Sequence, residues 1–273
     1  MADTPVVPRL GVRHESVPLV MGIVNVTPDS FSDGGRFLDA QAAIAHGREL
    51  FEQGAAILDV GGESTRPGAT PVALDTELAR VLPVVEALAP LGRVSIDTRK
   101  PEVARAAVAA GATLINDVSA SLWEVAADCG VGWVAMHMKG EPGTMQEAPV
   151  YDDVVGEVAA FLVDRATRAA DAGVQEIWID PGIGFGKTHE HNLALLSSID
   201  RLAGLGWPVL VGTSRKAMLG QLLAESDGVA EVPPDDRLAG SIASEVWAMH
   251  LGARMIRAHD VRSAVQAAKV VAA

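Results

Sequence analysis

Residues 93–117 read RVSIDTRKPEVARAAVAAGATLIND and contain one complete repeat of the pattern that decides the fold. The apolar runs Arg93–Ile96 and Thr113–Ile115 have the length of buried strands, and the Ala-rich stretch Pro101–Ala110 between them has the length of a helix. Gly111 stands where a helix C-cap is expected, just before the second strand. Continuous rather than alternating hydrophobicity is typical of parallel strands buried on both faces.

The same pattern recurs along the 273 residues, so that eight apolar runs alternate with helical stretches. This alternation predicts an α/β protein, a single-domain (β/α)8 TIM barrel over residues 1–273, with residues 1–18 covering the barrel bottom. Residues 225–236 are expected to form a loop. The runs are Leu19–Val24, Ala56–Val60, Arg93–Ile96, Thr113–Ile115, Gly132–Met136, Glu176–Ile179, Pro208–Val211 and Arg254–Ile256. Helices are expected over Asp39–Gln53, Asp75–Ala89, Pro101–Ala110, Tyr151–Ala172 and Asn192–Leu202.

Composition excludes several classes of protein. A formal net charge of −13 disfavours nucleic-acid binding, which depends on Lys and Arg at phosphates. Cys129 is the only cysteine, so an intramolecular disulfide and a cysteine metal cluster are excluded. We see no signal-peptide pattern and no uncharged apolar run of the ~18 residues that a membrane span needs. The expected compartment is the cytoplasm.

Each apolar run is followed at once by short polar residues that set geometry rather than solubility. Because the carboxyl ends of the strands form the active-site face of an α/β barrel, these positions predict the site. They are Asn25, Asp59 to Glu63, Asp97, Asn116 with Asp117, His137, Asp180, Thr213 to Lys216, and His259 with Asp260.

Two kinds of chemistry are expected at these strand ends. Asp97, Asn116 and Asp180 should point to the barrel centre, where carboxylates and an amide suit a flat heterocycle rich in N–H groups. Arg257 and His259 end the eighth strand, beside the first strand after closure, and suit a phosphate.

Asn25 ends the first strand and can ligate a hard metal such as Mg2+ through its amide oxygen. Residues 212–216, GTSRK, leave the seventh strand and open a helix, where exposed N–H groups make an anion or carbonyl site. Residues 182–188, GIGFGKT, resemble a phosphate loop, but Pro181 stands where that motif needs glycine, so we interpret them as a tight loop against a ligand. His189 and His191 are interpreted as exposed histidines at a helix start.

Two long stretches carry a family resemblance. Residues 21–35, MGIVNVTPDSFSDGG, and 59–68, DVGGESTRPG, resemble the two signatures of the dihydropteroate synthase family. The resemblance continues in order through residues 95–98, 115–117, 136–138, 180–182, 214–216 and 257–260, and covers about residues 18 to 272.

This resemblance implies an enzyme of folate biosynthesis. Such a transferase joins 6-hydroxymethyl-7,8-dihydropterin pyrophosphate to 4-aminobenzoate and releases pyrophosphate, through a carbocation-like substitution. It implies catalytic roles for Asp97, Asp180, Lys216, Arg257, His259 and Asp29, and a pterin pocket of Asp97, Asn116, Met136, Asp180, Phe185, Gly212 and Lys216. Pyrophosphate would meet Asn25, Thr65, Arg66, Arg257 and His259, with Mg2+ on Asn25. Aminobenzoate would meet Phe31, Thr65, Arg66, Pro67, Phe185, Lys216 and Ser214.

The resemblance also implies a homodimer formed through outer helices, and sensitivity to sulfonamides, because the loop after Phe31 carries no insertion. Arg99 departs from the familiar pattern without touching an assigned role. Two alternatives are a corrinoid-dependent methyltransferase that binds a pterin, and a non-catalytic paralogue. The first should lack the Ser214-to-Lys216 and Arg257-to-His259 motifs, and the second should lose loop residues; all of these are present.

Overall fold

The computed structural model describes residues 17–27, 35–65 and 68–273. Eight parallel strands lie in one sheet in the order β6-β5-β4-β3-β2-β1-β8-β7. An isolated parallel bridge between Ile179 and Val209 joins the two ends of that order and closes the barrel. The strands are β1 (Leu19–Asn25), β2 (Ile57–Gly61), β3 (Arg93–Asp97), β4 (Leu114–Asp117), β5 (Gly132–Met136), β6 (Ile177–Asp180), β7 (Leu210–Val211) and β8 (Met255–Ala258). The predicted (β/α)8 barrel is confirmed.

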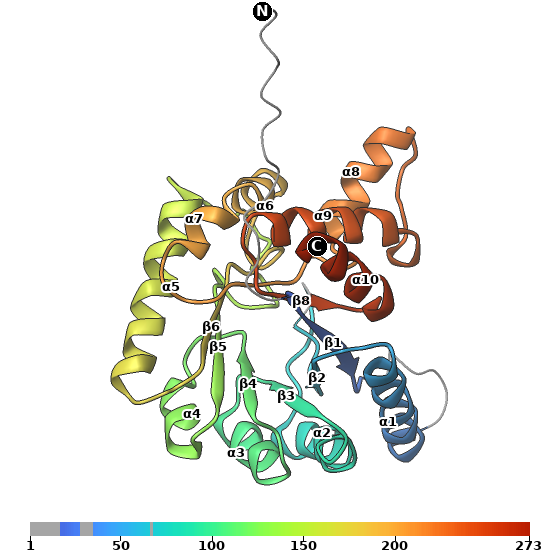
Figure 1. Ribbon diagram of the computed structural model, residues 1–273, viewed down its shortest axis with the longest axis vertical. Helices are drawn as coiled ribbons and strands as arrows, with labels where there is room; N and C mark the ends of the chain where they lie inside the picture. The colour runs from blue at the N-terminus through green and yellow to red at the C-terminus, as the bar shows by residue number, and fades with distance from the viewer. Residues whose placement is uncertain (1–16, 28–34, 66–67) are drawn as a thin grey trace, which may run out of the picture.

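Helices surround the strands (Figure 1). One helix prediction is wrong: residues 192–202 do not form a single helix but belong to two short ones, which separate at Ser197 and Ser198. Residues 225–236 form a loop between two helices only in part, since the preceding helix continues to Asp227. The helices are α1 (Gly35–Glu52), α2 (Leu74–Leu88), α3 (Pro101–Ala109), α4 (Trp123–Cys129), α5 (Val154–Asp171), α6 (His189–Leu196), α7 (Ile199–Ala203), α8 (Ala217–Asp227), α9 (Leu238–His250) and α10 (Val261–Ala272), with a 3-10 turn at Pro234–Asp236.

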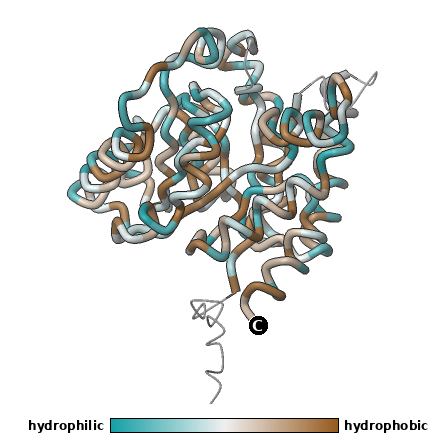
Figure 2. The backbone as a smooth tube through the Cα atoms, turned by 90° about the horizontal axis from the view of Figure 1, so that it is seen from above, coloured by the Kyte–Doolittle hydropathy of each residue, from teal (hydrophilic) through white to brown (hydrophobic). Residues whose placement is uncertain are grey.

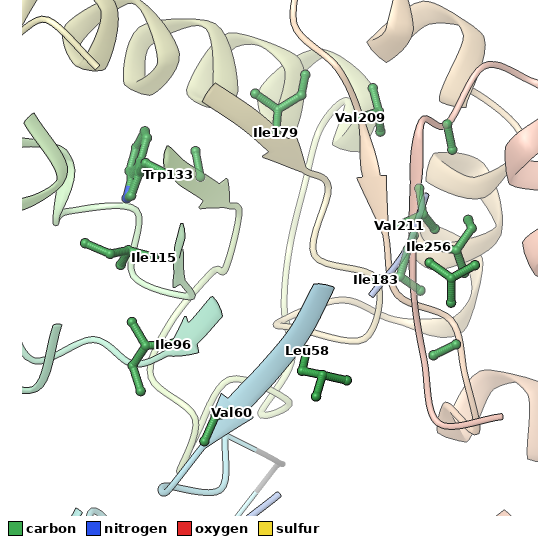
Figure 3. Close-up of a cluster of buried hydrophobic side chains, with 14 of the residues drawn as sticks. Leu58, Val60, Ile96, Ile115, Trp133, Ile179, Ile183, Val209, Val211 and Ile256 are labelled. Atoms are coloured by element: carbon green, nitrogen blue, oxygen red, sulfur yellow. The ribbon is translucent and has the colours of Figure 1, made fainter. Parts of the chain in front are cut away.

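Two apolar layers hold the barrel together. The larger lies between strands and helices, where Ile96, Ile115 and Trp133 project from neighbouring strands to the same side (Figure 3). In Figure 2 the apolar stretches gather in the middle of the molecule and the polar ones around its edge. The smaller layer fills the barrel interior with Met21, Ile57, Leu114, Val134, Trp178, Leu210 and Met255. This interior plug leaves only the carboxyl ends of the strands for a site.

Glycines between helices and strands behave as the sequence predicts. Gly111, with φ +113°, ends α3 and turns the chain into β4, a backbone conformation that side chains rarely adopt. Gly54, Gly173 and Gly252 do the same after α1, α5 and α9.

No helix within the described residues is long and apolar enough to cross a membrane. The N-terminal segment expected to cover the barrel bottom lies almost wholly outside the described residues, so that prediction stays untested.

Candidate active site

Strand periodicity selects which polar residues enter the barrel. Ile57 and Met255 belong to the interior plug, and side chains two residues apart along a strand share a face. Asp59 and Arg257 therefore point inward, just above the plug. Leu114 and Trp178 also belong to the plug, and Asn116 and Asp180 lie two residues after them on β4 and β6. Both side chains therefore point into the barrel, as the sequence predicts.

Asp117 shows the opposite outcome. It lies on the outer face of β4, fully buried, and its carboxylate accepts hydrogen bonds from the backbone N–H groups of Ser119, Ser121 and Leu122. It also accepts one from the Trp133 indole at 3.2 Å. Asp117 thus builds the loop after β4 and takes no part in the site.

A compact polar network occupies the centre. The Nε of Arg257 donates to Oδ2 of Asp59 at 2.6 Å, and its Nη2 donates to Oδ2 of Asp97 at 2.9 Å. The Asn116 amide donates to the same Oδ2 of Asp59 at 2.8 Å. Asp97 and Asn116 are cross-strand partners in the β3–β4 ladder. One arginine and two carboxylates therefore meet at the level where β2, β3, β4 and β8 end.

Burial dominates the protonation behaviour of this network. Loss of water and the nearby Asp59 carboxylate together raise the pKa of Asp97 to about 7, against the attraction of Arg257. Burial also raises the pKa of Asp180, against the Gly182 N–H and the Lys216 charge. The Oδ1 of Asp97 is buried and has no partner among the described residues. A buried acceptor without a donor is costly, which makes it a natural place for a ligand N–H.

The loop after β6 forms one wall. Oδ1 of Asp180 accepts a 2.7 Å hydrogen bond from the Gly182 N–H, which fixes the start of the loop. A Cβ on Gly182 would lie 1.9 Å from the His137 carbonyl oxygen, so only glycine fits there. Lys216 Nζ lies over the Phe185 ring, 4.1 Å from its centroid. The Lys216 cation thus lies over an aromatic face, and its charge also acts on the buried Asp180 carboxylate.

Lys187 anchors the loop after β6. Its role was not predicted from the sequence, because it lies within residues 182–188, which do not match the phosphate-loop motif. Its Nζ is buried and lies 2.9–3.2 Å from the carbonyl oxygens of Gly182, Phe185 and His137, and 3.0 Å from Nδ1 of His137. Burial lowers the pKa of Lys187 to about 7, and burial together with the Lys187 charge lowers the pKa of His137 to about 3. His137, although it follows β5 directly, is therefore a neutral support for the loop.

The segment between β7 and α8 forms the opposite wall. The Ser214 hydroxyl accepts from the His259 N–H at 3.1 Å and lies 3.1 Å from Nδ1 of the same residue. Arg215 turns away to Asp260 and Asp235, with contacts of 2.9 Å to each. Lys216 is the N-cap residue of α8, so the predicted helix opening is confirmed.

The base of the loop after β2 is held by ion pairs. The Glu63 carboxylate accepts from Val72 N at 2.9 Å and Arg99 Nε at 3.0 Å, and it also binds Lys100. A second nitrogen of Arg99 donates to Glu141 at 2.9 Å. Arg99 therefore joins this loop to the loop after β5, a link that its position beside Asp97 does not reveal.

The remaining predicted residues divide between described and undescribed parts of the chain. Asn25 is half-buried at the end of β1, Met136 is buried at the end of β5, and Gly212 follows β7 with its Cα facing Arg257. Thr65 is half-buried at the start of the β2 loop. Asp29, Phe31, Arg66 and Pro67 lie outside the described residues.

His189 and His191 open α6 as predicted, but they are half-buried rather than exposed, and the His191 ring packs against Tyr151 at 4.9 Å. The described residues contain no group of three or more His, Cys, Asp or Glu that could hold a metal ion by itself.

Comparison of the chain with known proteins identifies its family. The family described as "Pterin binding enzyme" matches residues 21–259. The dihydropteroate synthase of Escherichia coli K12 is 47% identical over 266 residues, which cover 94% of this chain and 92% of that protein. The chain belongs to the dihydropteroate synthase family. It is accordingly a transferase, and the resemblance seen in the sequence is confirmed.

Solved structures of this family carry the relevant small molecules. The dihydropteroate synthase of Xanthomonas albilineans with 4-aminobenzoic acid is 50% identical, with a TM-score of 0.85, and the match covers 93% of this chain and 91% of that one. The same enzyme is known in complex with 7,8-dihydropteroate, at 47% identity and a TM-score of 0.81 over 93% and 92% of the two chains. The Yersinia pestis dihydropteroate synthase with a sulfonamide drug is 44% identical, with a TM-score of 0.85 over 93% of each chain.

Proposed function

We propose that this chain condenses 6-hydroxymethyl-7,8-dihydropterin pyrophosphate with 4-aminobenzoate, giving 7,8-dihydropteroate and pyrophosphate. The observation that carries the proposal is the buried, unpaired Oδ1 of Asp97 beside Asn116, with Arg257 holding the other oxygen. A pterin offers N–H donors to such an oxygen, and its neighbouring pyrophosphate offers negative charge to the arginine.

The pterin would bind at the centre of the barrel mouth. Asp97 and Asp180 accept from its ring N–H groups, and Asn116 both donates and accepts. Lys216 donates to its carbonyl or ring nitrogen, while Met136 and Phe185 cover the ring faces. Gly212 leaves room beside the Arg257 side chain, since a Cβ there would already reach van der Waals contact at 3.6 Å.

Charge separation is the step that these residues favour. As the bond to pyrophosphate lengthens, the methylene carbon becomes cationic and conjugates with the pterin ring. The carboxylates of Asp97 and Asp180 stabilise the positive charge that spreads over the ring. Arg257 and His259 stabilise the negative charge that gathers on the leaving oxygen. No covalent enzyme nucleophile is needed.

The donor set fits Mg2+ with a single protein ligand. Mg2+ commonly keeps several waters and binds through one or two protein oxygens together with substrate phosphates. The half-buried Asn25 amide supplies one oxygen, and its cross-strand partner Gly61 has no side chain to fill the space beside it. When bound, the ion would neutralise charge on the pyrophosphate oxygens.

The aminobenzoate would lie between the two walls, with its carboxylate at the N-terminus of α8 near Ser214 and its ring against Phe185 and the Lys216 stem. Thr65 would approach from the β2 loop. The proposal includes Asp29, Phe31, Arg66 and Pro67 as contributors to the pyrophosphate and aminobenzoate sites, on the strength of the two signature motifs alone. Attack by the amine on the cationic methylene carbon then forms the new C–N bond, and the nitrogen releases one proton to give the neutral product.

We further propose a cytoplasmic homodimer. Helices α8 and α9 lie together at the edge of the molecule (Figure 1) and carry exposed large apolar side chains, among them Leu222, Leu238 and Trp247. Trp247 is 52% exposed, and a surface where exposed apolar side chains gather is a candidate subunit contact.

The deciding experiment couples pyrophosphate release to both substrates. We expect release that depends on aminobenzoate, and a loss of at least about 100-fold in kcat/KM on Asp97→Ala or Arg257→Ala, because each removes charge stabilisation used in the transition state. Release independent of aminobenzoate, or unaffected by both substitutions, would contradict the proposal. Thermal unfolding of the variants separates lost chemistry from lost folding.

A further inference from the structure

Asp59 opens the second signature motif, but it is the one carboxylate in the central network to which the proposed reaction assigns no role. It lies in β2 with 0% exposure, on the inward face above the interior plug. Its Cα pairs with Ile23 of β1 on one side and Ser95 of β3 on the other. Water cannot hydrate this group, so whatever stabilises its charge must be protein.

Two partners provide that stabilisation, and both face the substrate space. Oδ2 of Asp59 accepts from Arg257 Nε at 2.6 Å and from Asn116 Nδ2 at 2.8 Å. These contacts reach across the barrel from β2 to β8 and to β4. A single oxygen atom therefore fixes the orientation of two side chains that come from different strands.

The contact with Nε determines what Arg257 can present to a ligand. With Nε on Asp59 and Nη2 on Asp97, the plane of the guanidinium is set by two carboxylates. The hydrogen bonds that Arg257 makes to the described residues use Nε and Nη2. Nη1 can therefore bind an anion at the carboxyl ends of the strands. The same constraint leaves Oδ1 of Asp97 free for a ring N–H, because Arg257 takes only Oδ2.

We propose that Asp59 is a positioning residue for the pterin pyrophosphate half of the site, acting through Arg257 and Asn116. Its Oδ1 is also buried without a partner among the described residues, but Asp59 is 0% exposed whereas Asp97 is 8% exposed, so Asp97 and not Asp59 is within reach of a substrate. Its loss lets the Arg257 guanidinium rotate toward Asp97 and lets the Asn116 amide turn, so that the pterin and pyrophosphate contacts are lost together. This inference rests on the proposed function.

The first test is Asp59→Asn, which keeps the size and one acceptor oxygen but removes the charge. We expect kcat/KM for the pterin pyrophosphate to fall about 10–100-fold, the usual cost of removing a group that orients a functional side chain. The KM for 4-aminobenzoate should stay within about twofold, because its proposed site lies on the β2, β6 and β7 loops. Asp59→Glu keeps the charge but displaces the carboxylate by one methylene, and should show the same substrate-selective loss.

Asp117→Asn is the matched control. Asp117 has 0% exposure like Asp59, and the chemical change is the same, but its partners are the loop after β4 and the Trp133 indole, on the outer face of the strands. We expect it to lower the melting temperature without a loss selective for the pterin substrate. Equal, non-selective effects of Asp59→Asn and Asp117→Asn would overturn the positioning role.

A double-mutant cycle with Arg257→Gln separates action through Arg257 from a direct effect. If Asp59 acts through Arg257, Asp59→Asn in the Arg257→Gln background should cost less than about threefold. The full single-mutant loss in that background would contradict the proposal, as would wild-type kinetics in folded Asp59→Asn and Asp59→Glu. Failure of the wild-type chain to form dihydropteroate is a different result, which sinks the proposed function itself.

Discussion

The Nζ of Lys187 lies 3.0 Å from Nδ1 of His137, and the two residues lock the loop after β6 onto the end of β5. No carboxylate among the described residues accepts a hydrogen bond from this buried amine; its other acceptors are three backbone carbonyls. Because burial removes the amine from water and no carboxylate binds it, its pKa falls to about 7. The loop that carries Phe185 is therefore held by an amine whose pKa, about 7, lies close to neutral pH.

Lys187→Met should therefore loosen the wall of the pterin site. It removes the Lys187 hydrogen bond from three backbone carbonyls, of which the Gly182 oxygen still accepts from the Phe185 N–H, so we expect a loss of about 2–3 kcal/mol in unfolding free energy at pH 7. We also expect a higher KM for the pterin substrate. Lys269→Met, at an exposed position of α10, is the control and should change both quantities little. Equal effects of the two substitutions would contradict the assigned support.

The same pair predicts a pH dependence. The ordinary pKa of a lysine side chain is 10.5, whereas that of Lys187 in the folded protein is about 7, so between these pH values the unfolded chain binds the extra proton. Unfolding free energy should therefore rise with pH from about 7 to 10.5 through this group. Urea unfolding of wild type and Lys187→Met at about pH 7 and pH 9 measures it, and the difference between the two proteins should grow at the higher pH. A constant difference would show that Lys187 does not titrate in this range.

Glu245 should give the opposite trend. This α9 residue is 1% exposed, its Oε2 has no partner among the described residues, and burial, followed by the charge of Asp260, raises its pKa to about 8 from 4.5. The folded protein therefore retains a proton that the unfolded chain has lost, and stability falls as pH rises from 4.5 to about 8.

Glu245→Gln removes this dependence. Its stability relative to wild type should be greater at about pH 8.5 than at about pH 5.5, by on the order of 3 kcal/mol. Glu225→Gln, on the exposed face of α8, is the control. Thermal or urea unfolding at the two pH values gives the answer, and a pH-independent difference for Glu245→Gln would argue against a buried, protonated carboxyl group.

A sulfonamide should compete with aminobenzoate. Such drugs carry an aniline ring and a polar sulfonyl group, which match the proposed ring contact at Phe185 and the carboxylate contact near Ser214 and the start of α8. The apparent KM for aminobenzoate should rise linearly with sulfonamide concentration at constant kcat, and excess aminobenzoate should relieve inhibition. Undiminished activity at saturating sulfonamide would sink the prediction.

Trp247→Glu tests the homodimer. A charge at a buried subunit contact is costly, so the variant should sediment as a monomer at concentrations where wild type is dimeric, while its far-UV spectrum stays unchanged. Leu91→Glu, at a residue that is 54% exposed just before β3, is the control and should not alter the mass. A wild-type monomer, or a Trp247→Glu dimer of undiminished stability, would contradict the assignment of this surface.

The strands and most helices could be predicted because each depends on local pattern. Buried parallel strands require continuous apolar runs, and each of the eight expected runs overlaps a strand. The break at Ser197 and Ser198 was not predicted, because the apolar spacing continues across it and only packing against the barrel decides the turn. The site was predicted as a set of strand ends, and Asp97, Asn116 and Asp180 followed from side-chain type and order.

The sequence by itself determined the barrel and, through two long motifs, the family, and it predicted a site at the strand ends. Only the tertiary structure decided which polar residues work together. Asp59 and Arg257 are 198 positions apart, yet they share a hydrogen bond because closure sets β8 beside β1 and β2 next to it. The sequence did not reveal that Lys187 is buried under the loop after β6 or that Asp117 lies on the outer face of β4. Burial and strand register are properties of the closed barrel. Local patterns encode what each segment forms, whereas contacts between distant segments exist only once the chain has closed on itself.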